Sequence, residues 1–326
     1  MTSIEIPTTA VELRTTSPRS AFAMAGWPSV HYGALFVLAG TAIGARAVFG
    51  SASGMHAPRT VVVACGAIFA LAGLYVAVNG VIDIRRKRAA AERAASMPAE
   101  PWWWDYPWRP DGIGNDTRRE IARASGFALF FVIFLTPFHW VGFFSEHPVP
   151  PFAIGALFFD VVLVGVFVRA ARLALMRRRY GASWLRFKRF PFHPGEPVEL
   201  SLDGYGGLSA MTQLTGTLRC VQERYETRGS GRNRSTKVVC YALWSATMVA
   251  ERNRDGGFDF AFDVPAGAPA SALAERPARY WELAVKSDDV PGVDYSASFY
   301  VPVYQRRRQA RRTWGPRPAN TRSPFP

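Results

Sequence analysis

The sequence lacks the residue patterns on which most enzyme active sites are built. It has no glycine-rich phosphate loop, no nucleophile elbow, and no cluster of His or Cys at metal-ligand spacing. Four of the five histidines are scattered along the chain: His31, His56, His147 and His193. We therefore expect no catalytic residue, no cofactor and no metal, and we predict that the protein is not an enzyme.

Lysine is scarce, so the formal net charge of +14 comes almost wholly from arginine. In a soluble protein such an excess would suggest nucleic-acid binding. Here much of the arginine flanks long apolar runs, where the positive-inside rule and anionic headgroups account for it. We therefore expect the lipid bilayer as a partner and no nucleic acid.

The two ends of the chain lack a regular hydrophobic period. Residues 1–26 mix acidic and basic residues with Thr and Pro, which predicts a flexible N-terminal arm without a cleavable signal peptide. Residues 305–326 contain seven arginines and four prolines, which predicts a disordered basic tail.

Four apolar stretches lie between residues 27 and 176, and each has about the 20 residues that a helix needs to cross a bilayer. They run from Ser29 to Phe49, Thr60 to Ile82, Phe127 to Phe144 and Pro151 to Val168. The Ala-rich run after Arg88 should continue the second helix until Pro98 ends it. The sequence therefore predicts a four-span membrane domain at 27–176.

The loop at 85–125 carries nine basic residues, whereas the turn between the first two spans carries only Arg59. Positively charged loops stay in the cytoplasm. We therefore predict a multi-pass protein of the cell membrane, inner or plasma, with both termini in the cytoplasm.

Within this loop, residues 101–111 hold four tryptophans, Trp102, Trp103, Trp104 and Trp108, and also Tyr106. Amphipathic rings between two membrane spans favour a belt at the lipid headgroups. A docking epitope for a partner is the alternative.

From residue 177 to 304 the period changes to two. Phe258, Phe260 and Phe262 alternate with polar or small residues, and similar alternation covers 281–286 and 293–303. Further strands fit 183–190, 197–203, 212–226 and 236–251. Seven strands without a strong helix between them predict an antiparallel β-sandwich, so the fold class is α+β by segments: a four-helix transmembrane domain and then the sandwich.

The second half resembles the arrestin-like, immunoglobulin-like β-sandwiches of multi-span bacterial membrane proteins of unknown function. The resemblance is carried by Ala278–Val285, Pro291–Tyr295, Phe299–Val303, Leu214–Cys220 and Phe260–Pro265, and by the Tyr180-Gly181 step and the Trp108–Asp111 loop. It implies a protein-interaction or scaffold module and no catalysis.

Two of the three cysteines fall on the long strands predicted at 212–226 and 236–251. If these strands form a hairpin closed by residues 228–234, Cys220 and Cys240 face each other and share parity with the apolar residues. The pair is either a disulfide or redox switch, or two buried thiols, which a reducing cytoplasm favours. Cys65 is predicted to pack against lipid or another helix within the second span.

Three ionisable residues lie inside the predicted spans: Arg46, His139 and Asp160. Charges in a bilayer are costly and mark functional sites by default. Since they lie on three different helices, they could converge as a polar site for a proton or small ligand. The alternative, which we favour, is a structural Asp160–Arg46 pair with Arg46 reaching outward.

These features predict a membrane protein that presents a cytoplasmic β-sandwich as a binding or scaffold module. We expect it to bind a protein partner or to form a homo-oligomer. Possible lipid or partner contacts are the four tryptophans and the hairpin-loop arginines Arg228, Arg232 and Arg234. One alternative is a small channel or transporter centred on Asp160, and a second is a subunit of a larger membrane complex.

Overall fold

The fold is described from a computed structural model of the chain. The described residues are 11–13, 26–50, 58–115, 117–146, 148–204, 207–208, 211–228, 235–287 and 294–306. Most of the predicted N-terminal arm and the tail from 307 to 326 lie outside them.

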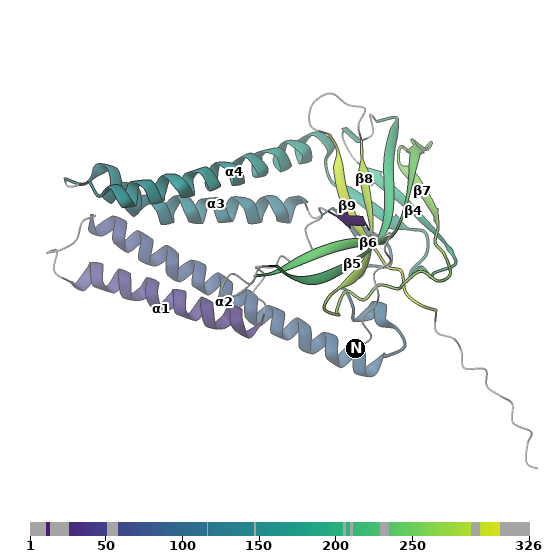
Figure 1. The fold of residues 1–326 in the computed structure, drawn as a ribbon, viewed down its shortest axis with the longest axis horizontal. Coiled ribbons are helices and arrows are strands. Elements are labelled where there is room, and N and C mark those ends of the chain that lie inside the picture. Colours follow the sequence, from purple (N-terminus) through teal and green to yellow (C-terminus); the bar gives the residue numbers. More distant parts are fainter. Residues whose placement is uncertain are drawn as a thin grey trace, which may run out of the picture.

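The described part of the chain contains four helices long and apolar enough to cross a membrane. They are α1 (Trp27–Phe49), α2 (Arg59–Ser96), α3 (Thr117–His139), which continues into the π-helical turn η2 (Trp140–Phe144), and α4 (Pro150–Tyr180). Each contains one of the four predicted spans, and α2 ends two residues before Pro98, as predicted. Figure 1 shows two antiparallel pairs, α1 with α2 and α3 with α4.

The α1–α2 pair packs through glycines spaced seven residues apart. Gly33 and Gly40 of α1 face Gly66 and Gly73 of α2 so closely that the backbones touch. A Cβ on Gly73 would lie 2.6 Å from the carbonyl oxygen of Gly33. Small residues allow this close approach. The resulting van der Waals contact holds the helices together, because lipid provides no hydrophobic driving force for their association.

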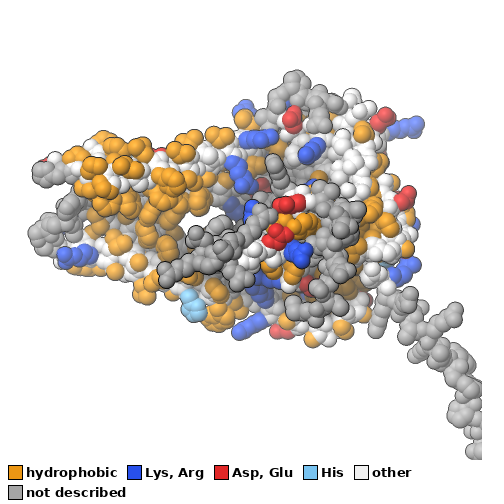
Figure 2. Space-filling view, viewed as in Figure 1, with side chains coloured by type: hydrophobic (Ala, Val, Ile, Leu, Met, Phe, Trp, Pro, Cys, Tyr) orange, Lys and Arg blue, Asp and Glu red, His pale blue; other side chains and the backbone are white. Residues whose placement is uncertain are grey.

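The α3–α4 pair packs through larger side chains. Ring contacts join Phe131 to Phe159 at 6.1 Å and Phe138 to Phe152 at 5.9 Å between centroids. The two pairs meet where Phe69 of α2 lies against Phe134 of α3, with centroids 5.3 Å apart. Nearer the sandwich the pairs separate (Figure 2).

The helices leave apolar side chains uncovered. On α4, Val161 is 75% exposed and Phe158 67% exposed. Hydrophobic side chains cover the helical half in Figure 2, whereas charged side chains gather over the sandwich and its junction with the helices. Such an extended apolar surface is rare on a soluble monomer and is the surface that a lipid environment solvates.

The rest of the described chain forms two antiparallel sheets. The first has the order β1 (Val11–Leu13), β6 (Ser235–Glu251), β5 (Gln213–Arg228), β8 (Arg279–Lys286), β9 (Ser296–Val301). The second has the order β2 (Gly112–Gly114), β3 (Ser183–Phe187), β4 (Pro197–Gly204), β7 (Phe258–Asp263). The predicted fold class, four helices followed by an antiparallel β-sandwich, is confirmed.

The sandwich core follows from the alternation seen in the sequence. Phe258, Phe260 and Phe262 are buried, while the residues between them are exposed. They face Leu214 and Leu218 of β5, which belong to the same apolar cluster.

One short junction joins the helices to the sandwich. Gly181 ends α4 with a φ of +73°, a conformation that favours glycine, and β3 begins two residues later. Tyr180 is buried in the sandwich cluster, where its ring lies 5.5 Å from that of Tyr295. The last residue of the membrane helix is therefore part of the sandwich core, four residues beyond the domain boundary predicted at 176.

The structure corrects the prediction of seven strands, because two strands come from segments predicted to be irregular. Val11–Leu13, from the predicted flexible arm, pairs with β6, and Gly112–Gly114, from the predicted loop, pairs with β3. Three-residue strands are too short to show a period in the sequence. They form because each adds to an existing strand edge.

The predicted pairing of Cys220 with Cys240 is wrong. Cys220 lies opposite Trp244, and Cys240 lies opposite Glu223, because the whole ladder is offset by three to four residues from the predicted register; the bulge between Cys220 and Val221 accounts for one of them. Neither cysteine forms a disulfide, and both are buried. Burial raises the pKa of Cys220 to about 12, so it stays protonated and unreactive, as expected of a packed thiol.

The glycine packing predicts a cost for added volume between α1 and α2. Gly73→Ala places a Cβ against the backbone of α1, so the helices must move apart at a cost of about 1–3 kcal/mol. Gly44→Ala, whose Cβ meets nothing within 4 Å, is the matched control in the same pair. Denaturant unfolding of the full chain in detergent measures both, and equal effects would contradict this account of the packing.

Candidate functional site

The structure brings together two of the three ionisable residues predicted inside the spans. His139 of α3 and Asp160 of α4 form an ion pair, with Nε2 of His139 2.9 Å from Oδ2 of Asp160. Arg46 lies exposed on α1, and among the described residues it forms no ion pair with Asp160. The favoured Asp160–Arg46 pair is therefore wrong: α1 packs on α2, while α4 packs on α3.

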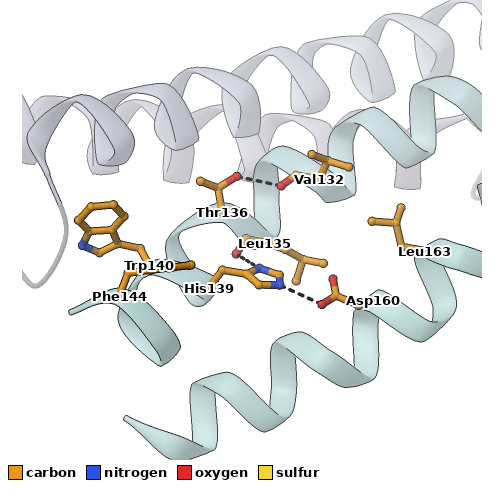
Figure 3. A pocket seen from close by; sticks show the side chains of 8 residues that line it. All are labelled: Val132, Leu135, Thr136, His139, Trp140, Phe144, Asp160 and Leu163. Carbon is orange, nitrogen blue, oxygen red and sulfur yellow. Dashed lines mark hydrogen bonds and ion pairs between the residues drawn. The ribbon is translucent and has the colours of Figure 1, made fainter. Parts of the chain in front are cut away.

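His139 is held at both ring nitrogens (Figure 3). Its Nδ1 lies 2.9 Å from the carbonyl oxygen of Leu135, one helical turn earlier. A carbonyl oxygen only accepts hydrogen bonds, so Nδ1 carries a hydrogen. The ring is therefore fixed with Nε2 directed at Asp160.

This geometry fixes how many protons the pair holds. With Nδ1 protonated, the Nε2–Asp160 hydrogen bond needs one proton between the two groups. The pair is then either imidazolium with carboxylate or neutral imidazole with carboxylic acid. In both forms the two side chains are neutral together, which lowers the cost of placing them among apolar side chains.

The pair lines a pocket of about 450 Å³ between α3, η2 and α4. Val132, Leu135, Thr136, His139, Trp140, Phe144, Asp160 and Leu163 line it. No residue of α1 or α2 is among these, so the pocket belongs to one helical pair and not to the space between the two pairs.

Local sequence explains the shape of α3 at this point. Pro137 has no N–H, which frees the carbonyl of Ile133 from its helical bond, and the thiol of Cys65 on α2 lies 3.7 Å from that oxygen. Two residues after the proline, His139 leads into η2, and Gly142 then packs directly against the backbone of Ala153. A π-helical turn often marks a functional site.

The Trp-rich segment lies in the sandwich, bound by a buried carboxylate. Asp105 accepts hydrogen bonds from the backbone N–H groups of Leu273 and Ala274, at 2.9 and 2.5 Å. It also accepts the hydroxyl of Tyr304 at 2.8 Å, and that hydroxyl accepts the indole N–H of Trp108 at 2.8 Å. We call these four contacts the Asp105 clamp.

The clamp contradicts the predicted lipid belt for Trp108, which is 8% exposed within the sandwich cluster. Trp102 packs against the same cluster, and the indole N–H groups of Trp103 and Trp104 bond to Glu100 and Met97. Burial and the neighbouring Asp105 carboxylate raise the pKa of Tyr304, so its hydroxyl stays a donor. Trp102 and Trp108 therefore pack on the sandwich, whereas Trp103 stays 40% exposed.

Sequence reasoning missed Asp105 and Tyr304, because the two residues are 199 positions apart. The available signal was one acid among four tryptophans. Of the predicted contact residues in the hairpin loop, Arg232 and Arg234 lie outside the described residues, and Arg228 is described only as the last residue of β5. Within the described ranges no group of three His, Cys, Asp or Glu could hold a metal.

Comparison with known proteins does not assign the chain to a family. No protein-family model and no curated protein matches the chain. Among solved structures, Spo0M, a sporulation control protein from Bacillus subtilis, is similar at 14% identity and a TM-score of 0.26, over 38% of this chain. The similarity covers 49% of that protein, so this chain spans about half its length. The arrestin-like resemblance stays a prediction from the strand motifs.

The clamp predicts that Asp105→Ala destabilises the junction. Three donors would lose their acceptor, and each buried donor left unpaired costs about 1–3 kcal/mol. Asp111→Ala is the control: it removes an exposed pair with Arg109, and we expect a change within about 0.5 kcal/mol. Urea unfolding of the full chain in detergent compares them, and similar losses would show that the clamp does not hold the segment.

Proposed function

We propose that the chain is an integral membrane protein of the plasma, or inner, membrane that presents a cytoplasmic β-sandwich as a non-catalytic binding module. The charge bias of the loop at 85–125 supports this orientation. The Asp105 clamp and the buried Tyr180 support a fixed position of the sandwich relative to the helices. A partner bound to the sandwich would be held at a fixed position beside the membrane.

One observation carries the binding role. The strand β8 pairs with β5 only as far as Gln222, and β1 pairs with β6 only from Cys240 onward. Beyond these positions Tyr225–Arg228 and Ser235–Val238 pair with each other and with no other described strand. We call this pair of segments the hairpin arm, and Figure 1 shows β5 and β6 reaching from the sandwich toward the helices.

A two-stranded ribbon is marginally stable by itself in water. The hydroxyl of Tyr241 donates to Glu226 and braces the base of the arm. Tyr225 remains 46% exposed, and Lys237 is also exposed. Tyr225 and Lys237 lie on opposite faces of the ribbon, because Tyr225 pairs with Val238 and Lys237 with Glu226. An exposed aromatic ring on a projecting element is typical of a protein contact. The arm is therefore the contact element that we assign to a protein partner, including another subunit of a larger membrane complex.

The channel or transporter alternative gains one supporting observation, the His139–Asp160 pair. However, the pocket around this pair is lined by α3, η2 and α4 alone. A conduit through the four-helix domain would need lining residues from both helical pairs. The binding module is the function that the geometry supports better.

The orientation predicts the behaviour of reporters fused after the last residue of the full chain. A green fluorescent protein there should fluoresce, and alkaline phosphatase should be inactive, because the basic loop keeps both termini in the cytoplasm. An active phosphatase with a dark fluorescent protein would place the sandwich on the other side of the membrane.

The contact role predicts position-dependent crosslinking. A photoreactive amino acid at Tyr225 of the arm should give a discrete protein adduct in native membranes. Val249, which is 55% exposed but lies at the opposite end of the β5–β6 ladder, is the matched control and should give none. Adducts to lipid alone from Tyr225, or the same protein adduct from both positions, would contradict the proposal.

A further inference from the structure

The polar atoms left free around His139 and Asp160 in the pocket are hydrogen-bond acceptors. The hydroxyl of Thr136 donates to the carbonyl oxygen of Val132 at 2.9 Å, so its oxygen is left as an acceptor. Both nitrogens of His139 are already engaged. Among the described residues Asp160 bonds through Oδ2 alone, and Oδ1 accepts in either protonation form of the pair. Beside these acceptors the pocket has the indole N–H of Trp140 as a donor, and in Figure 3 that nitrogen lies on the side of the ring away from Asp160.

The charge of the pocket further restricts which ligands can bind. Because His139 and Asp160 are neutral together, a charged ligand would bring an uncompensated charge into an apolar site, which is costly. A neutral hydroxyl, by contrast, can donate one hydrogen bond and needs no counter-ion. The polar end of a fitting ligand is therefore an alcohol and not an amine or an acid.

The remaining lining side chains are largely apolar. Val132, Leu135, Trp140, Phe144 and Leu163 surround the polar groups, and the volume of about 450 Å³ lies in the usual range of small-molecule sites. Phe144, which lines the pocket, is 68% exposed and so forms part of its open rim. If the helices span a membrane, as proposed above, this rim faces lipid.

We propose that this pocket binds the hydroxyl end of a neutral lipid alcohol that enters from the membrane. The hydroxyl donates to the oxygen of Thr136, and the hydrocarbon leaves past Phe144. The inference rests on the membrane location in the proposed function but not on the binding role of the sandwich.

The experiment uses the full chain in lipid nanodiscs with a long-chain alcohol that carries a diazirine. Its methyl ether, which lacks the donor, is the first comparison. An alkane carrying the diazirine is the second, and it reports membrane insertion alone because it should label all four helices. We expect the alcohol to label α3 and α4 around the pocket about threefold to tenfold more strongly than the ether, the effect of one neutral hydrogen bond.

Two matched variants test the residue assignment. Thr136→Val should lower alcohol labelling at the pocket about threefold to tenfold, and Thr136→Ser, which keeps the hydroxyl, should restore it. Thr41→Val on α1 removes an equivalent hydroxyl, bonded to the carbonyl of Val37 at 2.8 Å, and should change nothing.

Equal labelling by alcohol and ether would overturn the proposed ligand. Equal losses in Thr136→Val and Thr41→Val would overturn the proposed site. Failure of the alkane to label the four helices would instead overturn the membrane location, and with it the proposed function and this inference.

Discussion

The connection between the two halves of the molecule depends on one buried carboxylate. Asp105 follows the second membrane helix, yet its hydrogen-bond donors come from residues 273, 274 and 304 at the far end of the chain. A buried charge needs such partners to offset the loss of water. Because the loop before α3 is held in this way, and because α4 ends in the buried Tyr180, the sandwich is attached to the helices at two places.

The helices themselves use two modes of packing. In α1 and α2, glycines let the backbones touch, so van der Waals contact replaces side-chain interlocking. In α3 and α4, phenylalanines fill the space, and the proline at 137 and the π-helical turn leave room for a polar pair and a pocket. The glycine-packed pair suits a structural role, whereas the pair packed through phenylalanines holds the hydrogen-bonded His139 and Asp160.

Those ionisable groups satisfy one another before any ligand is considered. His139 is oriented by a backbone carbonyl and shares a proton with Asp160, so two costly groups become one neutral unit. The pocket keeps free acceptors at Thr136 and Asp160 and one donor, the indole N–H of Trp140. The neutral charge of the pair and the hydrogen-bonding atoms that it leaves free restrict the possible ligands more strongly than the pocket volume does.

Much of the fold could be predicted from local periodicity. Long apolar runs bounded by arginine located the four spans, and alternation such as that of Phe258, Phe260 and Phe262 located seven strands. The predicted site was only partly right, since the sequence supplied His139 and Asp160 together with Arg46, but not their pairing.

The remaining features were decided by tertiary structure. The register of β5 on β6 is offset by three to four residues from the one that placed Cys220 opposite Cys240, and the bulge after Cys220 adds one residue to this offset. The partner of Asp160 depended on which helices pack together, and the place of Trp108 depended on Tyr304, 196 residues away. The sequence by itself determined the four long helices and the seven longer strands, because that information is local. Only the folded chain determined the two short edge strands and which elements meet, because those contacts join residues far apart in the chain.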